Sequence, residues 1–481
     1  MNYKLLLNLF GKTFIICALF FFAPAIVALC YSENNYIAFL IPAVGLMFIG
    51  GLLQLFKPKN KSISPKEAFV ITALSWIVLS VVGSLPYIIS GEVVSFVDAL
   101  FETVSGLTTT GASVLTNVEV LSKSLGFWRV FTHFMGGMGV LVFLLVIMPQ
   151  DNGSAIHLLR AESPGPTATK FASKIRFTAR ILYIIYISLT LIMAVMLICG
   201  GMDVYESFVH AFSTAGTGGF STRNGSIAAF NSTYVEIVIA VFMFLFGINF
   251  NVFYLILIGK FSRALFGEEF LIYVSMVIAA TLIIALNIVG IVGSFGNALR
   301  FSFFQTASIS STTGFSTADF NTWPALSQAV LLMLMVVGGC GGSTAGGIKV
   351  ARLAILTKSS VTDLKKMMRP RAVVSTKFER ETLDSSTVNA VRVYFTLWVA
   401  ILIISTLILS IDGFGGFIED FTGSLSCIGN VGPGLGLVGP MGGYSAYGAG
   451  SKIALCFTML AGRLEIIPLF VLFSFRTWKK S

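Results

Sequence analysis

Four short clusters rich in glycine and in threonine, serine or asparagine contain the residues of this sequence best suited to bind an ion. They are residues 108–113 (TTTGAS), 217–222 (TGGFST), 312–317 (TTGFST) and 430–434 (NVGPG). Glycine permits the left-handed backbone that turns successive carbonyl groups toward one axis. Rings of such carbonyls replace the water shell of a dehydrated cation in selectivity filters. Neighbouring hydroxyl groups add oxygen ligands without charge, which suits a monovalent ion that must also leave.

The spacing of the clusters indicates an internal repeat. Gly111, Gly219, Gly314 and Gly432 are separated by 108, 95 and 118 residues. One such cluster is as well explained by a turn or a close helix contact. Four clusters at matching places can surround one axis, as four subunits do in a tetrameric channel. We therefore predict a cation filter formed by Thr109, Thr110, Gly111, Thr217, Gly218, Gly219, Thr312, Thr313, Gly314, Asn430, Val431 and Gly432.

Two further features are predicted to lie below the filter. Residues 338–347 (GGCGGSTAGG) interrupt an apolar stretch and are too flexible and polar to continue as a helix in lipid. Arg463 is predicted midway along the last helix, where a charge is costly and often functional. There it would repel a cation, although an ion pair with a carboxylate between helices is the alternative. The predicted gating residues are Gly338, Gly339, Gly341, Gly342, Ser343, Thr344, Gly346, Gly347, Lys349 and Arg463.

Composition places these residues in a membrane. Of 481 residues, 56% are hydrophobic and 11% are charged, and the mean hydropathy is +0.88. In a soluble protein about a quarter of the residues are charged. The six cysteines form no CxxC pair, and His133, His157 and His210 are scattered. We therefore expect no metal cluster, no catalytic constellation, no organic cofactor and no enzymatic activity.

Ten apolar stretches approach the roughly 20 residues that span a bilayer. Their centres lie near residues 18, 46, 78, 138, 190, 244, 281, 336, 400 and 463. The first could alternatively be a secretory signal, but its apolar run exceeds the ~7–15 residues of a signal core. The fold class predicted is an all-α polytopic membrane protein. Its segments are a helix pair (1–66), pore repeats 1 and 2 (67–150 and 151–260), repeat 3 with the gating loop (261–360) and repeat 4 (361–481).

Positive charge predicts the orientation, because lysine and arginine accumulate in cytoplasmic connectors. Basic residues follow the second, fourth, sixth and eighth stretches and end the chain, so both termini are predicted to be cytoplasmic. This also explains the net charge of +10 without nucleic acid. The filter clusters then enter from outside, where acidic residues could enrich cations or be ordinary surface charge. These are Asp98, Glu102, Glu119, Asp203, Glu206, Asp319, Asp412, Glu419 and Asp420.

Taken in order, the four clusters, the sequence GGSTAGGIK ending at Lys349 and the sequence GRLE ending at Glu465 resemble the Trk/Ktr/HKT superfamily of potassium transporters. The resemblance covers essentially the whole chain, and the extra N-terminal helix pair favours the Trk branch. It implies potassium uptake in the bacterial inner membrane by a homodimer whose protomers each have a pore. It also implies an intramembrane gating loop at 338–347, Arg463 below the filter, and a cytoplasmic nucleotide-binding ring subunit of the TrkA type. Glycine at all four filter positions favours potassium over sodium.

Two other functions remain open at this point. A secondary transporter that couples potassium to protons or sodium would need a titratable or second ion site at mid-membrane, for which Arg463 and Glu465 are among the few candidates. A membrane-embedded enzyme would need paired carboxylates, clustered histidines or a nucleophile facing a cavity. The sequence offers no such set.

Overall fold

The structure is a computed structural model that describes residues 2–58, 64–139, 175–371, 374–474 and 478. Several residues of the sequence predictions lie outside these ranges. They are His157, the connector residues Lys59, Lys61, Arg160, Lys170 and Lys174, the terminal residues Arg476, Lys479 and Lys480, and the predicted boundary at 150.

The described chain is predominantly helical, which confirms the predicted fold class. Its only strands are β1 (Lys377–Phe378) and β2 (Glu381–Thr382), which pair antiparallel. The first part of the chain forms α1 (Tyr3–Phe20), α2 (Phe22–Cys30), α3 (Tyr36–Gln54), α4 (Pro65–Ile89), α5 (Phe96–Leu107), α6 (Lys123–Met138), α9 (Ile175–Cys199), α10 (Val204–Gly216), η1 (Ser226–Phe230), α11 (Thr233–Phe246), α12 (Phe250–Leu257) and α13 (Phe261–Leu265). The second part forms α14 (Glu268–Val292), α15 (Phe295–Ser310), η2 (Phe320–Thr322), α16 (Ala325–Val337), α17 (Val350–Met368), α18 (Ser385–Asp412), α19 (Phe417–Gly429), η3 (Gly436–Val438), α20 (Ala449–Arg463) and α21 (Ile467–Phe473).

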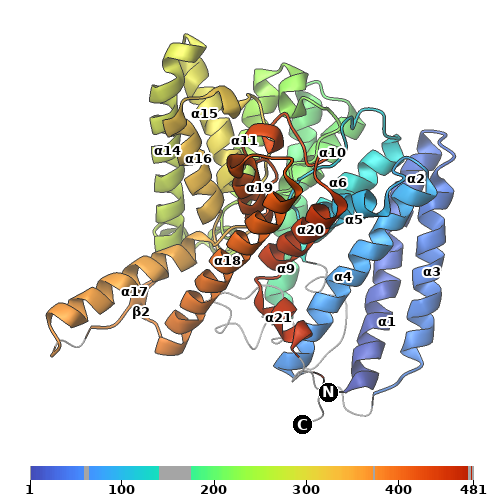
Figure 1. Cartoon of the computed structure of the whole chain (residues 1–481), viewed down its shortest axis with the longest axis horizontal. Helices are drawn as coiled ribbons and strands as arrows, with labels where there is room; N and C mark the ends of the chain where they lie inside the picture. Colours follow the sequence, from blue (N-terminus) through green and yellow to red (C-terminus); the bar gives the residue numbers. More distant parts are fainter. Residues whose placement is uncertain (1, 59–63, 140–174, 372–373, 475–477, 479–481) are drawn as a thin grey trace.

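After α3 one pattern of helices recurs along the described chain. In each of four successive units a long helix is followed by a shorter one, a glycine cluster and a return helix. The units begin α4–α5–α6, α9–α10–α11, α14–α15–α16 and α18–α19–α20. The second helices have 12, 13, 16 and 13 residues. At 1.5 Å per residue they reach at most about 24 Å, which is shorter than the roughly 30 Å core of a bilayer. We name them pore helices after the predicted pore repeats to which they belong. Figure 1 shows α5, α10, α15 and α19 in the upper half of the molecule, each beside its own unit.

Each predicted stretch centre falls inside a helix, but four stretches are broken, and the one near residue 336 ends with α16 at Val337. The first is divided between α1 and α2 at Phe21. The helix pairs α11 and α12 and α20 and α21 are bent by 90° and 120°. Within the described residues, six helices are long and apolar enough to span a membrane, or eight if each bent pair counts as one span. The predicted boundary at 360 falls inside α17, because that helix runs on from the gating segment.

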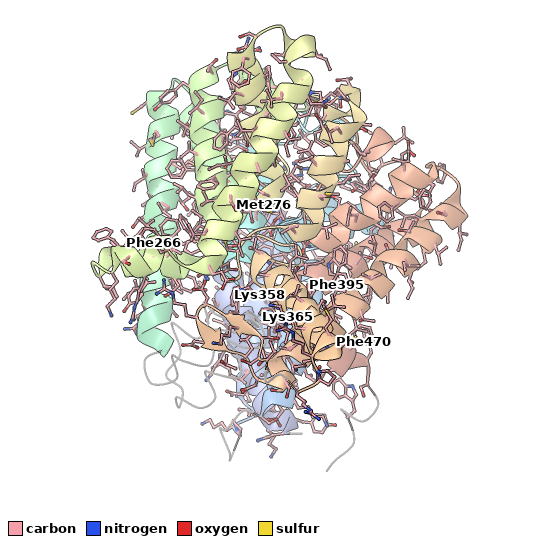
Figure 2. All side chains as sticks on the ribbon, turned by 90° about the vertical axis from the view of Figure 1, so that its left-hand side faces the viewer. Phe266, Met276, Lys358, Lys365, Phe395 and Phe470 are labelled. Carbon is pink, nitrogen blue, oxygen red and sulfur yellow. The ribbon has the colours of Figure 1, made fainter. Side chains whose placement is uncertain are left out.

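Large apolar side chains cover the outside of the long helices. Leu286 on α14 is 67% exposed and Phe48 on α3 is 67% exposed. In water such a continuous apolar surface would promote aggregation, whereas in a bilayer it contacts lipid. Figure 2 shows Met276 on α14 within this apolar region and Lys358 and Lys365 on α17 below it.

The leading helix pair packs tightly and supports α6. A Cβ atom at Gly11 of α1 would lie only 2.7 Å from the backbone oxygen of Gly50 on α3, so the two helices meet backbone to backbone. Glu33, in the turn between α2 and α3, accepts hydrogen bonds from the backbone N–H groups of Lys123 (2.7 Å) and Ser124 (3.0 Å). A carboxylate at this place satisfies free N–H groups of the first turn of α6. The extra pair therefore fixes the start of a helix that reaches the filter.

The two ends of the described chain meet on one side of the molecule. The Tyr3 hydroxyl donates to the backbone oxygen of Trp478 (3.3 Å), and the backbone N–H of Asn2 donates to Glu67 (2.7 Å) at the start of α4. The start of α1 and the end of α4 nearest to it lie at the bottom of Figure 1, away from the pore helices.

Candidate functional site

The four glycine clusters share one backbone conformation. In each cluster one residue other than glycine has a left-handed backbone. Its φ is 55° at Thr109, 54° at Thr217, 58° at Thr312 and 53° at Asn430. Two residues later comes glycine, with φ of 78° at Gly111, 81° at Gly219, 83° at Gly314 and 102° at Gly432. Only glycine takes this conformation without a steric penalty. The equal register shows that all four loops make the same turn.

Each loop is tied to the end of its own pore helix by the same backbone hydrogen bond. The residue before the filter glycine donates its N–H to the carbonyl five residues earlier, and that earlier residue is serine in every unit. The pairs are Thr110 to Ser105 (2.9 Å), Gly218 to Ser213 (2.9 Å), Thr313 to Ser308 (2.8 Å) and Val431 to Ser426 (2.9 Å). All four pore helices thus end at the loops, and the negative ends of their dipoles favour a cation there.

The loops close into a ring in the order in which they occur in the chain. A Cβ atom built on each filter glycine would collide with the carbonyl oxygen before the filter glycine of the next unit. The distances are 2.0 Å from Gly111 to Gly218, 2.0 Å from Gly219 to Thr313, 2.2 Å from Gly314 to Val431 and 2.6 Å from Gly432 to Thr110. The last pair returns to the first unit, so loops up to 322 residues apart enclose one axis.

The side chains of the predicted filter residues are buried, and several are hydrogen bonded to residues of the loops. The hydroxyls of Thr110 and Thr108 are 2.8 Å apart, and those of Thr313 and Ser311 are 2.7 Å apart. The Asn430 amide donates to the Thr110 hydroxyl (3.0 Å), across the junction of the fourth and first loops. The structure brings all twelve predicted filter residues to this ring.

The predicted gating segment follows α16 as an irregular loop. Gly338, Gly342 and Gly347 have φ of 69°, 75° and 77°. The segment folds back on itself, because a Cβ atom at Gly338 would lie 2.3 Å from the carbonyl oxygen of Gly346. Its backbone is also bonded to the break between α11 and α12, where Cys340 donates its N–H to the carbonyl of Gly247 (3.0 Å). Hydrogen bonds of this kind satisfy backbone groups of the loop inside the protein, which is needed away from water.

The far end of the gating segment contacts the filter directly. The N–H of Gly346 donates to the hydroxyl of Thr312 (2.7 Å), which is the first residue of the third filter loop. The N–H of Gly347 donates to the carbonyl of Gly429 (2.9 Å), the last residue of α19. A displacement of this segment would therefore be felt at two of the four loops.

Arg463 is not midway along the last helix, as the sequence had suggested. It is the final residue of α20, and the chain then bends by 120° into α21. Its guanidinium donates to the backbone oxygens of Thr344 in the gating segment (2.8 Å) and Gly136 on α6 (2.6 Å). The charge therefore joins the gating segment to the first unit through carbonyl groups.

Glu465, two residues after Arg463, neutralises cations at the end of the gating segment. Its carboxylate pairs with Arg352 on α17 and lies 3.7 Å from the Lys349 ammonium. Lys349 and Ile466 both have positive φ, of 78° and 68°. Residues other than glycine rarely adopt this backbone conformation, and strained backbone is often found at functional sites. Lys349 is thus placed at the junction of the segment and α17.

Several residues to which the sequence analysis gave no structural role are buried, and two of them, Glu102 and His133, contact the filter loops. Glu102 and Asp420, expected at the outer surface, are buried, with exposed fractions of 0% and 2%. Glu102 forms an ion pair with Arg129 (2.8 Å). His133 is not isolated either: its ring accepts from the N–H of Phe220 (3.3 Å), next to the second filter glycine. Aligning the four clusters on their glycines would have drawn attention to Glu102.

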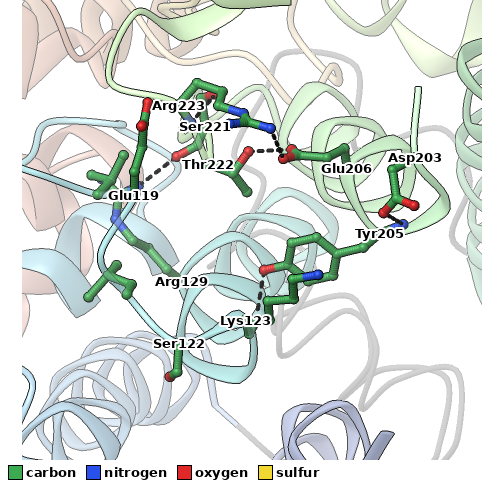
Figure 3. Close-up of a pocket in the computed structure, with 13 residues that line it drawn as sticks. Glu119, Ser122, Lys123, Arg129, Asp203, Tyr205, Glu206, Ser221, Thr222 and Arg223 are labelled. Atoms are coloured by element: carbon green, nitrogen blue, oxygen red, sulfur yellow. Dashed lines mark hydrogen bonds and ion pairs between the residues drawn. The ribbon is translucent and has the colours of Figure 1, made fainter. Parts of the chain in front are cut away.

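A cavity of about 350 Å³ opens beside the first and second loops. Figure 3 shows Arg129, Ser221 and Glu206 among the residues that line it, with Glu206 bonded to Thr222 and paired with Arg223. Acidic and basic groups alternate around it, so it offers no uniform field for one ion sign. Among the described residues no three histidine, cysteine, aspartate or glutamate side chains are grouped as metal ligands.

Comparisons with known proteins agree over the whole chain. The sequence pattern of the family TrkH, described as "Cation transport protein", matches residues 37–479. The Trk system potassium uptake protein TrkH of Escherichia coli K12 is 34% identical over 484 residues, covering 99% of this chain and 98% of that protein. TrkH of Vibrio parahaemolyticus is 33% identical over 491 residues and covers all of both chains. The crystal structure of the potassium transporter TrkH from Vibrio parahaemolyticus superimposes with a TM-score of 0.88, at 30% identity, over all of both chains.

Proposed function

The chain belongs to the TrkH family of cation transport proteins, and from this premise we propose that its ring of four glycine loops is the path through which potassium crosses the membrane. The chain is the membrane subunit of a Trk potassium uptake system, and potassium is the transported ion. The transport family gives no role to an organic cofactor or to a chemical conversion, and we assign none to this chain.

The observation that carries the proposal is the closure of the ring. The four loops share one backbone conformation, and each lies so close to the next that a Cβ atom on its filter glycine would collide with that neighbour. The fourth loop approaches the first in the same way. Backbone carbonyls in such a ring can replace the hydration shell of a cation. The twelve residues of the ring are the proposed filter, one loop from each of the proposed repeats at 67–150, 151–260, 261–360 and 361–481; the division at 360 falls inside α17.

The gating segment is proposed to open and close this path from below. Its bonds to Thr312 and Gly429 support a position against the filter, and Arg463 holds it through Thr344. A guanidinium on the path repels potassium, so movement of the segment and Arg463 together changes the barrier. The ten gating residues are Gly338, Gly339, Gly341, Gly342, Ser343, Thr344, Gly346, Gly347, Lys349 and Arg463.

The assembly is proposed to be a homodimer in the bacterial inner membrane, with a TrkA-type ring subunit on the cytoplasmic side. The surface that supports a partner is α17, which projects from the body of the molecule (Figure 1). Met367 and Met368 near its end are 78% and 81% exposed. Lys358 and Lys365 lie on the same helix (Figure 2), and their charge supports a cytoplasmic location. Both termini are placed on that side by the same rule.

Uptake through the filter is proposed to follow the electrochemical gradient. An inside-negative potential contributes ~2.3 kcal/mol per charge per 100 mV, which drives potassium inward without a second substrate. A coupled transporter is the rival. It would need an ion site that changes occupancy during transport, and Glu465 is already neutralised by Arg352 and Lys349.

The test is ion flux into liposomes that contain the purified full-length chain. Vesicles loaded with KCl should accumulate radioactive Rb⁺, and external K⁺ should compete better than Na⁺. An imposed voltage should drive this uptake with no proton or sodium gradient. Uptake that requires one of those gradients would favour the coupled transporter. Absence of flux, even with the cognate ring subunit present, would contradict the pore assignment.

A further inference from the structure

The position nine residues before each filter glycine carries a different chemical group in each unit. The residues are Glu102, His210, Gln305 and Gly423. All four lie on pore helices and are buried, with 0% exposure for the three that have a side chain able to hydrogen bond. Buried polar groups are expected to be hydrogen bonded, so the partners of these residues show what the position does.

Glu102 holds the segment that follows the first filter glycine. Its carboxylate accepts hydrogen bonds from the Ser113 hydroxyl (2.6 Å) and the Val114 backbone N–H (2.7 Å), two and three residues after Gly111. The other carboxylate oxygen accepts from Arg129 Nε (2.8 Å). Three donors on one buried carboxylate fix the outer end of the loop against its own pore helix.

Arg129 extends this support to the second loop. Besides Glu102, its guanidinium donates to the backbone oxygen of Ser221 (3.3 Å), two residues after Gly219. It also lies 3.5 Å from the centre of the Phe220 ring, within the range of a cation–π contact. The Glu102–Arg129 pair therefore joins two adjacent loops of the ring, and Arg129 also lines the cavity in Figure 3.

The second and third units repeat the arrangement with neutral groups. His210 Nδ1 is 2.8 Å from the backbone oxygen of Glu206. A carbonyl only accepts, so Nδ1 carries the proton and the other nitrogen, Nε2, accepts from the Ser221 hydroxyl (2.9 Å). In the third unit the Gln305 amide donates to the backbone oxygen of Ala318 (3.3 Å), four residues after Gly314.

The fourth unit replaces the side chain with a tyrosine from outside the pore helix. A Cβ atom at Gly423 would lie 3.4 Å from the ring of Tyr444, at ordinary van der Waals distance, so that ring packs directly against the position. The Tyr444 hydroxyl donates to the backbone oxygen of the filter glycine itself, Gly432 (2.9 Å). The Tyr444 N–H donates to the backbone oxygen of Ser113 (2.8 Å), which joins the fourth loop to the first.

We propose that Glu102, with Arg129, and Tyr444 are positioning residues that set the preference of the filter for potassium over sodium. They act through the loops and do not touch the ion. Potassium is favoured only while the ring keeps the size of the larger ion, and these bonds oppose its contraction or widening. The first loop is held from both sides, by the Glu102–Arg129 pair and by Tyr444, so it is the loop most dependent on them. The proposal rests on the filter assignment made above.

The experiment compares the competition of K⁺ and Na⁺ for Rb⁺ uptake by purified full-length variants in liposomes. Glu102→Gln keeps the shape but removes the charge and places a donor among three donors. We expect the K⁺/Na⁺ preference to fall about tenfold, the effect of losing one charge-assisted hydrogen bond. Glu102→Asp, which keeps the charge, should recover part of the preference. The matched control is Glu236→Gln, which breaks the Glu236–Arg300 pair (3.4 Å) between α11 and α15.

The result that overturns the proposal is a folded Glu102→Gln protein with the preference of the wild type, or an equal loss in Glu236→Gln. If Glu102→Gln does not fold, Tyr444→Phe decides, because it removes one hydroxyl and keeps the ring. A fall in its K⁺/Na⁺ preference supports the proposal, and no change overturns it. Gly314→Ala, measured in the same assay, separates the filter assignment from the proposed role of the positioning residues. If it alters the preference while the positioning variants do not, the filter stands and this inference fails; if it does not, the filter assignment itself fails.

Discussion

Substitution of a filter glycine should change ion selectivity through one identifiable collision. In Gly314→Ala the added Cβ atom would lie 2.2 Å from the Val431 carbonyl oxygen and 2.9 Å from a ring carbon of Pro433. Ordinary contact begins at 3.4 Å, so the carbonyl or the third loop must move by about 1.2 Å. The φ of 83° adds a further cost of about 1–2 kcal/mol for a residue with a side chain.

This displacement lies in the ring of oxygens that would hold the ion. A loss of about 1.4 kcal/mol in the preference for potassium lowers the K⁺/Na⁺ ratio about tenfold. The assay is Rb⁺ uptake into KCl-loaded liposomes with K⁺ or Na⁺ as competitor, normalised to the protein that elutes as a folded species. We expect at least this tenfold loss in Gly314→Ala.

Gly293 provides a matched control in the same unit. It has φ of 77°, and a Cβ atom built there meets nothing within 4 Å. Gly293→Ala therefore carries the same backbone cost without a collision, and it should lower stability while leaving the K⁺/Na⁺ ratio unchanged. Equal effects of the two substitutions on the ratio would refute the reasoning, because strain alone would then explain the loss.

Three further predictions concern the parts around the filter. Arg463→Ala should raise uptake, since a barrier lower by about 1.4 kcal/mol gives about tenfold more flux; initial rates of Rb⁺ uptake measure it. Glu465→Gln should lower the free energy of unfolding by about 3 kcal/mol, because it removes the negative charge that pairs with the buried Arg352. A lower unfolding temperature in a thermal-shift assay would detect this loss. Gly50→Ala should lower the unfolding temperature by forcing α1 away from α3, while Gly51→Ala, which meets nothing within 4 Å, should not.

Each of these predictions has a distinct contrary result. Arg369→Ala removes an exposed charge at the end of α17 and should leave uptake unchanged; an increase equal to that of Arg463→Ala would argue against a local barrier. An unchanged melting curve for Glu465→Gln would contradict a stabilising role for the Glu465–Arg352 pair. A change in the K⁺/Na⁺ ratio in Gly50→Ala would contradict a purely supporting role for the leading helix pair.

The filter loops could be predicted from the sequence because their backbone leaves few choices of residue. A turn with φ near 80° and a neighbour within 2.2 Å admits only glycine, so Gly219 and Gly314 occur in nearly identical sequences. Likewise, residues 338–347 contain too many glycines to remain helical. The order of the loops around the ring could not be predicted, because it depends on contacts between residues 94 to 322 positions apart.

The groups behind the filter were missed for a different reason. Glu102 and Asp420 are acidic residues near predicted outer ends of helices, where solvated charge is common, and only tertiary packing buries them. The break after Arg463 was missed because the strained residues Glu465 and Ile466 have no special composition. Pro468, in the first turn of α21, was the one local sign of a new helix start.

The most direct measurement of the central claim is a crystal structure of the protein in RbCl, with rubidium located by its anomalous scattering. The account predicts rubidium on the axis enclosed by Gly111, Gly219, Gly314 and Gly432, within coordination distance of the loop carbonyls. Rubidium found elsewhere in the membrane region, with this ring empty at saturating RbCl, would contradict the account.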